Sequence, residues 1–382
     1  MRRAPTIWHA ASVSAVVALS GACDRQHRRP PPRQRGPVPA LSASAFEPSE
    51  RAEPAPSLLP PVASALEEAR ERVEILPPRD PPQMLAFGKG RIAQLAGSKV
   101  VFRDTSEGAV IAESELGAAR AVTVGIDASL CALGLSSGAR LEPQLKKPRS
   151  FPHVAFFPGA ALFPDLEDAR HFYVYYAAPP QLFHYPFEAE AGPFLPIEDR
   201  FPLSGCVATP VLTHDGAFLC LTADGVERRA PRGREAHFKW PTGVKAGARL
   251  LPGKRLDELF SATRSGEVTH LRMQAGFPVL GRFQLPQPLF AAAANEEALA
   301  FVLVSAPGGP RHFSLLVTDF DGQERFKADL PSRPTPPSDD WLDALTGDEN
   351  LAISGFEPLV AVGGPGALRV WDYAKGALVF SR

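Results

Sequence analysis

Short apolar runs separated by Gly or Pro turns recur along the chain from about residue 83 to the C-terminus. Runs such as Ile92 to Ala96, Val100 to Phe102 and Ala109 to Ala112 alternate in polarity or are apolar throughout, which is typical of strands in packed sheets. The 3.6-residue period of amphipathic helices is almost missing there. The pattern therefore predicts an all-β fold.

The runs group into seven units. They are Met84–Glu113, Ala121–Leu145, Val154–Phe187, Cys206–Arg229, Ala248–Phe283, Leu289–Leu330 and Leu351–Phe380. Their mean spacing of about 45 residues is the period of a four-stranded propeller blade. The sequence therefore predicts a single β-propeller over residues 83–382, with seven four-stranded blades. A ring of six or eight blades is an alternative, as is a β-sandwich pair, although a sandwich does not explain the repeated turn.

The repeated turn is clearest in the first and last units. Asp104 and Asp372 each lie four residues before a glycine, Gly108 and Gly376. Asp-Gly pairs elsewhere supply the positive φ that tight hairpins require. These pairs are Asp215-Gly216, Asp224-Gly225 and Asp321-Gly322.

The segment Val370-Trp371-Asp372-Tyr373 resembles the third strand of a WD40-type propeller repeat. The period extends this resemblance over about 300 residues, but only this copy carries the motif, so the chain is similar to degenerate bacterial propellers of the WD40-like or quinoprotein-like group. The resemblance implies a ring around a central channel, and a role in binding other macromolecules. From the residues alone, Trp371 is interpreted as a packing residue and Asp372 as a turn cap.

The first 22 residues have the layout of a signal peptide. Arg2 and Arg3 precede an apolar run from Ile7 to Leu19, and small residues precede Cys23. The run of about 13 residues is short for a membrane span, which needs about 20. The cysteine resembles the lipidated residue of bacterial lipoproteins, although Leu19 lies four residues before it where that family usually has Leu at three. We predict an exported protein lipidated at Cys23 and anchored in the bacterial envelope. Plain secretion and a retained membrane anchor are the alternatives.

Residues 23–82 are dominated by Pro, Ala, Arg and Ser and cannot build a core. We predict a disordered, Pro-rich tether that would hold the propeller away from a membrane. Residues 62–76 are compatible with one short helix, and Val73 to Leu76 could instead be a strand that closes the ring.

Charge and cysteine content limit the partners. The chain has 41 Lys and Arg against 42 Asp and Glu, a net charge of -1, so no nucleic-acid partner is predicted. We expect a monomer. If Cys23 is lipidated, Cys131, Cys206 and Cys220 remain. A two-residue turn at Asp215-Gly216 would place Val211 opposite Cys220, so three free cysteines in the core are favoured over a bridge to Cys206.

No catalytic, metal-binding or cofactor-binding set is evident. Four Trp and the absence of Ser-x-Asp-x-Gly-x-Thr-Trp turns argue against quinoprotein and sialidase types of enzyme. No Gly-x-Ser-x-Gly elbow is present, and the histidines are scattered singly, without metal-ligand spacing. A non-enzymatic role is favoured, and no cofactor or metal is predicted.

Aromatic residues are dense between Phe151 and Phe201. Most would be core in a strand. The Pro-rich stretch from Pro179 to Phe201 also suggests a projecting loop that binds a partner, another envelope protein or complex, through Phe183, Tyr185, Phe187 and Phe194. The predicted function is thus a membrane-tethered binding or scaffolding module. The alternative is a propeller enzyme, or a sensor of a small ligand or carbohydrate, with its site at the channel mouth.

Overall fold

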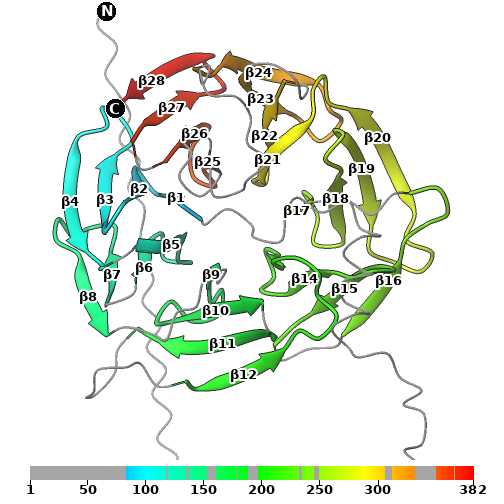
Figure 1. The fold of residues 1–382 in the computed structure, drawn as a ribbon, viewed down its shortest axis with the longest axis horizontal. Helices are drawn as coiled ribbons and strands as arrows, with labels where there is room; N and C mark the ends of the chain where they lie inside the picture. The colour runs from blue at the N-terminus through cyan, green and yellow to red at the C-terminus, as the bar shows by residue number, and fades with distance from the viewer. Residues whose placement is uncertain are drawn as a thin grey trace, which may run out of the picture. The chain divides into compact units, whose positions relative to one another are not determined.

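A computed structural model describes residues 83–117, 119–134, 137–152, 161–177, 179–187, 197–231, 235–244, 249–305, 312–331, 350–364 and 366–382. Its described residues form seven four-stranded antiparallel sheets arranged in a ring (Figure 1). The predicted seven-bladed β-propeller is confirmed. The predicted signal peptide, tether, helix at 62–76 and closing strand at 73–76 lie outside the described residues.

Each blade is one continuous stretch of chain. The strands of the first four blades are β1 (Leu85–Gly88), β2 (Arg91–Ala96), β3 (Lys99–Asp104), β4 (Val110–Glu115), β5 (Ala119–Val124), β6 (Leu130–Gly134), β7 (Ser137–Leu141), β8 (Arg149–Pro152), β9 (Ala161–Pro164), β10 (His171–Ala177), β11 (Pro180–Pro186), β12 (Asp199–Pro202), β13 (Val211–Leu212), β14 (Phe218–Leu221), β15 (Gly225–Arg229) and β16 (Ala236–Lys239).

The remaining three blades follow the same order. Their strands are β17 (Arg249–Pro252), β18 (Glu258–Ala262), β19 (Glu267–Arg272), β20 (Val279–Gln284), β21 (Leu289–Ala294), β22 (Leu299–Val304), β23 (Phe313–Thr318), β24 (Glu324–Asp329), β25 (Asn350–Ile353), β26 (Leu359–Gly363), β27 (Leu368–Asp372) and β28 (Ala377–Ser381). In every blade the first strand is innermost and the fourth lies on the rim (Figure 1).

The predicted blades end too early in the second, third and fourth units. Their fourth strands, β8, β12 and β16, read Arg-Ser-Phe-Pro, Asp-Arg-Phe-Pro and Ala-His-Phe-Lys. A rim strand packs on only one neighbour and needs few apolar residues, so its sequence does not stand out as a strand. These strands complete blades whose apolar inner strands were recognised.

The core lies between the blades. Seven apolar clusters fill the seven junctions of the ring, each built from two neighbouring blades. The junction of the last blade with the first contains Leu85, Phe87 and Ile92 on one side and Ala361 and Leu368 on the other. The ring is therefore closed by side-chain packing, with no strand shared among the described residues.

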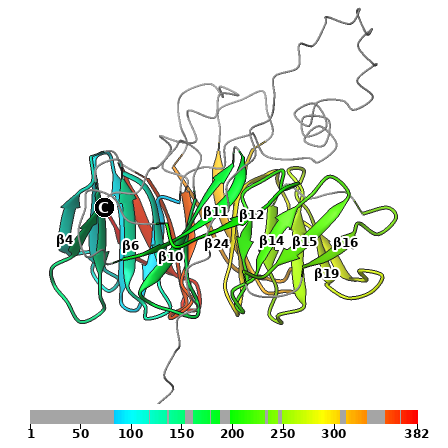
Figure 2. The ribbon, with the colours of Figure 1, turned by 90° about the horizontal axis from the view of Figure 1, so that it is seen from below.

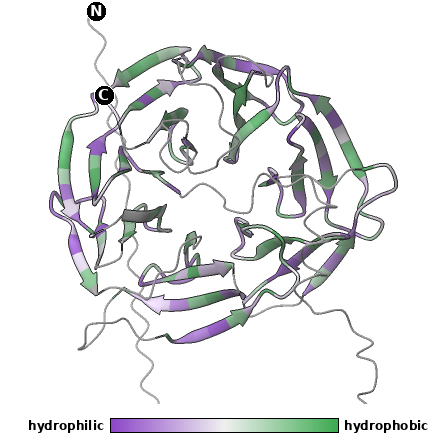
Figure 3. Cartoon of the chain, in the orientation of Figure 1, coloured by the Kyte–Doolittle hydropathy of each residue, from purple (hydrophilic) through white to green (hydrophobic). Residues whose placement is uncertain are grey.

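Strand polarity agrees with this arrangement. Apolar and polar residues alternate along many strands (Figure 3), and β20, on the rim, alternates between half-buried and exposed positions throughout. The described residues include no helix, so none of them forms a helix able to cross a membrane.

The ring has two faces, and the turns between strands lie at one or the other of them (Figure 2). Because successive strands are antiparallel, the turn from first to second strand and the turn from third to fourth strand lie on one face of each blade. We call this the inner-turn face. The second-to-third turns and the connections between blades lie on the other face.

Candidate functional site

The innermost strands of the ring are mostly apolar. The seven innermost strands are β1, β5, β9, β13, β17, β21 and β25. Their sequences contain Leu, Ala, Phe, Val, Ile and Pro almost throughout, and their only ionisable residues are Arg120 and Arg249. None of these seven described strands contains Asp, Glu or His.

Polar groups meet at the mouth of the channel instead. His214, in the turn after β13, and Glu296, in the turn after β21, come from the fourth and sixth blades, yet His214 Nδ1 lies 4.0 Å from a Glu296 carboxylate oxygen. Since the fifth blade separates their blades in the ring, this pair lies across the inner-turn face. Among the described residues, this pair best fits the predicted alternative of a ligand-binding site at the channel mouth.

Large apolar side chains are exposed on the same face. Ile126, Leu256 and Phe356 occupy first-to-second strand turns of the second, fifth and seventh blades, with 54%, 54% and 44% of their surface exposed. Ile197, just before β12, is 41% exposed. Four of the seven exposed large hydrophobic residues of the described chain therefore lie on one face of the ring. They come from the second, third, fifth and seventh blades, so they are distributed around this face.

A His and carboxylate cluster lies at the inner-turn end of the third blade. The buried His184, on β11, has Nε2 2.9 Å from Asp165 Oδ2, and its ring stacks on Tyr173 at 4.6 Å between centroids. The ring of His171 stacks on His184 at 4.8 Å, with Glu198 3.0 Å from its Nε2. The sequence did not suggest this cluster because His171 and His184 are 13 residues apart, and only the β10–β11 register brings them together.

The neighbouring blades have contacts that correspond to the pairing of Asp165 with His184. In the second blade, Asp127 in the first turn pairs with Arg140 on the third strand at 2.6 Å. Asp215 pairs with Arg228 in the same way in the fourth blade. Asp165 and His184 occupy the corresponding positions of the third blade. Within the described residues, no group of three or more His, Cys, Asp or Glu forms a metal site, and these three contacts connect the first turn to the third strand.

The aromatic segment lies mainly in the core. Tyr185 and Phe187, 3% and 7% exposed, pack between the second and third blades, with Tyr185 stacked on Phe172 at 5.6 Å. Phe183 is half-buried against the same cluster and lies under the guanidinium of Arg200. These positions agree with the alternative that the sequence left open, in which the aromatic residues are core.

The predicted projection of Pro179 to Phe201 is wrong for most of this stretch. Pro180–Pro186 is strand β11 and Asp199–Pro202 is strand β12, both inside the third blade. The predicted third unit, Val154–Phe187, already included β11, whereas β12 lies beyond its end. Phe194 lies outside the described residues, as does Cys23. Partner binding through Phe183, Tyr185, Phe187 and Phe194 stays a prediction.

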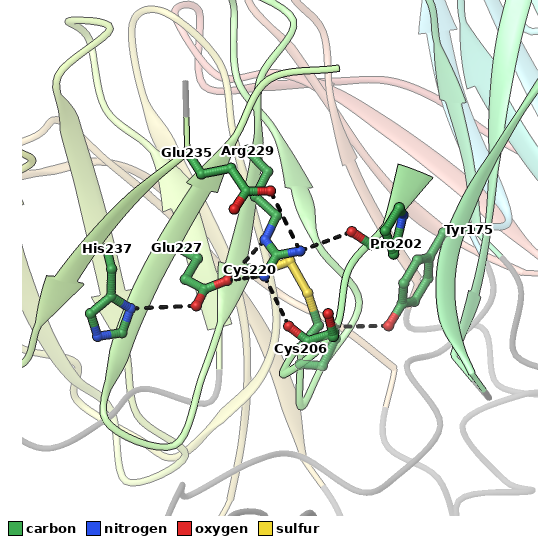
Figure 4. The surroundings of a disulfide bond; sticks show 10 residues. Tyr175, Pro202, Cys206, Cys220, Glu227, Arg229, Glu235 and His237 are labelled. Carbon is green, nitrogen blue, oxygen red and sulfur yellow. Dashed lines mark hydrogen bonds and ion pairs between the residues drawn. A yellow bond between two sulfur atoms is a disulfide. The ribbon is translucent and has the colours of Figure 1, made fainter. Parts of the chain in front are cut away.

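Cys206 and Cys220 form a disulfide, contrary to the interpretation that all three cysteines are free (Figure 4). The loop after β13 has three residues, His214 to Gly216, because Thr213 bonds to Ala217 and Gly216 adopts φ 77°. Val211 consequently faces Leu219, one residue before Cys220. Cys206 lies in the connection between β12 and β13, outside the hairpin on which the prediction of free cysteines was based. Cys131 is buried and free, and burial raises the pKa of its thiol to about 12.

An arginine supports the same connection. Arg229 donates to the carbonyl oxygens of Pro202 at 2.8 Å and of Ser204 at 3.0 Å, and its Nε donates to Glu227 (Figure 4). The guanidinium and the disulfide thus fix the passage from the third blade to the fourth. Arg229 thus donates hydrogen bonds to Glu227 and to the backbone of Pro202 and Ser204, and these bonds stabilise the connection.

Trp371 and Asp372 have the roles that the residues alone indicated. Trp371 is buried between the last two blades, and its ring centroid lies 6.4 Å from that of Phe326. Asp372 accepts hydrogen bonds from the backbone N–H groups of Ala374 and Lys375.

Comparisons with known proteins identify the fold. No protein-family model and no curated protein sequence matches the chain. A functionally unknown protein from Desulfotomaculum acetoxidans DSM 771 has a similar structure, with a TM-score of 0.51 and 13% identity, covering 74% of this chain and 92% of that one. Saccharomyces cerevisiae Sqt1 has a TM-score of 0.48 and 10% identity, covering 79% of this chain and 85% of that one. BamB from Moraxella catarrhalis has a TM-score of 0.40 and 13% identity, covering 75% of this chain and 81% of that one. At 13% identity, the likeness to the Desulfotomaculum protein concerns the fold alone.

Proposed function

We propose that this chain is an exported β-propeller, lipidated at Cys23, that binds another component of the cell envelope and has no catalytic role. The observation that carries the binding role is the exposure of Ile126, Leu256 and Phe356 in equivalent turns of three blades. Exposed apolar side chains on a rigid scaffold lose little conformational entropy on binding. A partner covering the inner-turn face would contact all three.

Export is supported by cysteine chemistry. Disulfides form in oxidising compartments and are rare in the cytosol, and Cys206 is bonded to Cys220. Arg2, Arg3 and the apolar run before Cys23 have the layout of a lipoprotein signal. Lipidation would consume Cys23 and leave one disulfide and the buried Cys131, so every cysteine of the chain is accounted for.

Labelling with radioactive palmitate tests the anchor. The wild-type chain should incorporate the label and sediment with membranes, whereas Cys23→Ser should do neither. The matched control is Cys131→Ser, which leaves the signal intact. Recovery of soluble, unlabelled wild-type protein outside the cytoplasm would reduce the proposal to plain secretion.

Capture of an envelope partner tests the binding role. Replacing Ile126, Leu256 and Phe356 by Ser should abolish capture while leaving the melting temperature nearly unchanged, because exposed side chains contribute little to stability. The control is Leu280→Ser, on the rim strand β20 and 40% exposed. Equal loss with the control would place the contact elsewhere.

A second candidate function uses the channel mouth. The approach of His214 to Glu296 from two non-adjacent blades places an imidazole and a carboxylate at the inner-turn face. A small polar ligand bound there would make the chain a sensor. Binding of such a ligand should be lost in His214→Ala and kept in the Ile126, Leu256 and Phe356 variant, so the two functions give opposite results.

A further inference from the structure

The contact between the first turn and the third strand has a different chemistry in the third blade. In the second and fourth blades, an aspartate of the first turn pairs with an arginine, Arg140 or Arg228. The corresponding residue of the third blade is His184, whose Nε2 lies 2.9 Å from Asp165 Oδ2. A guanidinium is always charged in proteins, whereas an imidazole gains or loses its charge between about pH 5 and 8. The third blade therefore has a contact whose charge changes near neutral pH.

Carboxylate oxygens lie near both nitrogens of two imidazole rings in this blade. His184 has Asp165 at Nε2, and Glu198 Oε2 lies 3.8 Å from its Nδ1. His171 has the same Glu198 oxygen 3.0 Å from Nε2 and Asp168 Oδ2 3.1 Å from Nδ1. A neutral imidazole carries one N–H, so its second nitrogen presents a lone pair to a carboxylate. Each ring therefore exchanges a repulsive contact for an attractive one when it takes up a proton.

The two rings share the Glu198 carboxylate. They stack on each other at 4.8 Å between centroids, and His184 is 7% exposed. The Nδ1 atom of His171 is buried and has no hydrogen-bond partner among the described residues, despite the nearby Asp168 oxygen. Among those residues, the two imidazoles are the only cationic groups paired with Glu198. The charge state of the rings therefore decides whether the Glu198 side chain is held.

The other titratable and charged groups on the elements packed against the rings have partners of their own. They are Glu167, Asp168 and Arg170 on the first turn, Tyr173 on β10, Asp199 and Arg200 on β12, and Glu227 and Arg229 on β15 of the fourth blade. Hydrogen bonds from Arg170 hold the pKa of the Asp168 carboxyl well below its usual value. Asp168 is thus ionised wherever an imidazole titrates, and the change of charge belongs to the rings.

Glu198 stands at the start of the rim strand of the third blade (Figure 1). Its N–H donates to the carbonyl oxygen of His184 at 3.0 Å, and β12 begins at the next residue, Asp199. Ile197, one of the exposed apolar residues of the inner-turn face, directly precedes it. Holding the Glu198 side chain therefore fixes both the start of β12 and the position of Ile197.

We propose that His171, His184 and Glu198 form a pH-sensitive contact that fixes the start of β12 when an imidazole is protonated and releases it when both are neutral. Proton uptake turns a contact between a lone pair and the Glu198 carboxylate into an ion pair. Because the charged form gains a partner only in the folded chain, the stabilisation is present on the acid side and is lost as pH rises through the titration of the rings. The lowered aspartates act elsewhere, below about pH 4.

Hydrogen exchange of the full chain tests this contact. The protection of the Glu198 amide, corrected for the intrinsic effect of pH on exchange, should fall roughly tenfold between about pH 5.5 and 8. The Ser129 amide is the internal control, because it donates to Asp127 beside the arginine of the second blade. Its protection should stay constant. Equal protection of the Glu198 amide at both pH values would overturn the proposal.

Variants assign the effect to the three side chains. Glu198→Gln should give low protection at both pH values, because the amide side chain forms no ion pair. His171→Gln combined with His184→Gln should also remove the pH dependence. The matched control is Glu113→Gln, whose carboxylate is 44% exposed against 45% for Glu198 and pairs with Lys99 in the first blade. It should behave as wild type. Full pH dependence in folded Glu198→Gln would overturn the proposal, and neither lipidation nor partner capture enters these measurements.

Discussion

At the scale of single residues, neighbouring side chains on one strand have different environments. On β11, Phe183 is half-buried beside Arg200, whereas Tyr185 lies in the junction of the second and third blades. Burial raises the pKa of the Tyr185 hydroxyl, as expected of a phenol in the core. A large aromatic residue in a Pro-rich segment can therefore be core, and composition alone does not separate the two cases.

Tyr185→Ala should destabilise the propeller by about 3–5 kcal/mol, the range for removing a buried aromatic side chain. Phe183→Ala, on the same strand, should cost clearly less. Thermal unfolding followed by circular dichroism measures both. A melting temperature unchanged in Tyr185→Ala would instead support its predicted role as an exposed anchor.

The disulfide is the second residue-scale test. Replacing Cys206 and Cys220 by Ser should lower the free energy of unfolding by about 3 kcal/mol, because the bridge closes a loop with a sequence separation of 14. Adding a reductant should reproduce the loss in the wild type and have no further effect on the double variant. Equal unfolding midpoints of the wild type with and without reductant would show that the bridge is not formed in solution.

At the scale of the element, the corner between the third and fourth strands is built by one aspartate. Asp104 and Asp372 end β3 and β27, and each accepts two backbone N–H groups of the following turn. Burial raises the pKa of Asp372, but the hydrogen bonds and charge of Lys375 and the Ala374 N–H outweigh it, so the net pKa is lowered. The repeat read from the sequence is thus a repeat of turn capping.

Asp372→Ala should destabilise the protein by about 1–2 kcal/mol, because two backbone donors lose their acceptor. Asp372→Asn keeps an acceptor oxygen and loses only the pairing with Lys375, whose side chain is 79% exposed. It should cost about 0.5 kcal/mol or less. Denaturant unfolding of the two variants separates the cap from the ion pair, and similar losses in both would assign the effect to charge.

At the scale of the whole molecule, the ring is closed by packing between the last and first blades. A hydrogen bond from the Gln94 side chain to the Gly364 carbonyl, at 2.6 Å, and one from the Gly90 N–H to Glu357 connect the same two blades. Every blade therefore has two neighbours, and stability depends on all seven junctions together.

Stability should fall in acid. The carboxyl pKa values of Asp104, Asp127, Asp215 and Asp372 are lowered, since hydrogen bonds outweigh burial in all four and a nearby cation contributes in the last three. Between these lowered pKa values and the pKa of about 4 that an aspartate has in the unfolded chain, the unfolded chain binds more protons than the native one. The stabilisation is present above that pH and is lost as pH falls through the lowered values. Melting temperatures between pH 3 and 6 measure it, and Asp127→Asn with Asp215→Asn should flatten the slope.

Much of the fold could be predicted because a propeller repeats one local unit. Apolar inner strands and turn glycines are local features, and they predicted seven blades and the capping role of Asp372. The rim strands β8, β12 and β16 were missed because one-sided burial leaves little apolar signal. The candidate site was not predictable in the same way, since Ile126, Leu256 and Phe356 are ordinary residues until the ring places them on one face.

The sequence by itself determined the apolar inner strands and the turns, and their repeat predicted seven blades, because these features depend on residues close together in the chain. Tertiary structure alone decided which residues meet. The bond between Cys206 and Cys220 depends on a connection between blades, and the stacking of His171 on His184 depends on strand register. The approach of His214 to Glu296 depends on closure of the whole ring. Contacts between distant segments are set by register and ring geometry, which no local pattern encodes.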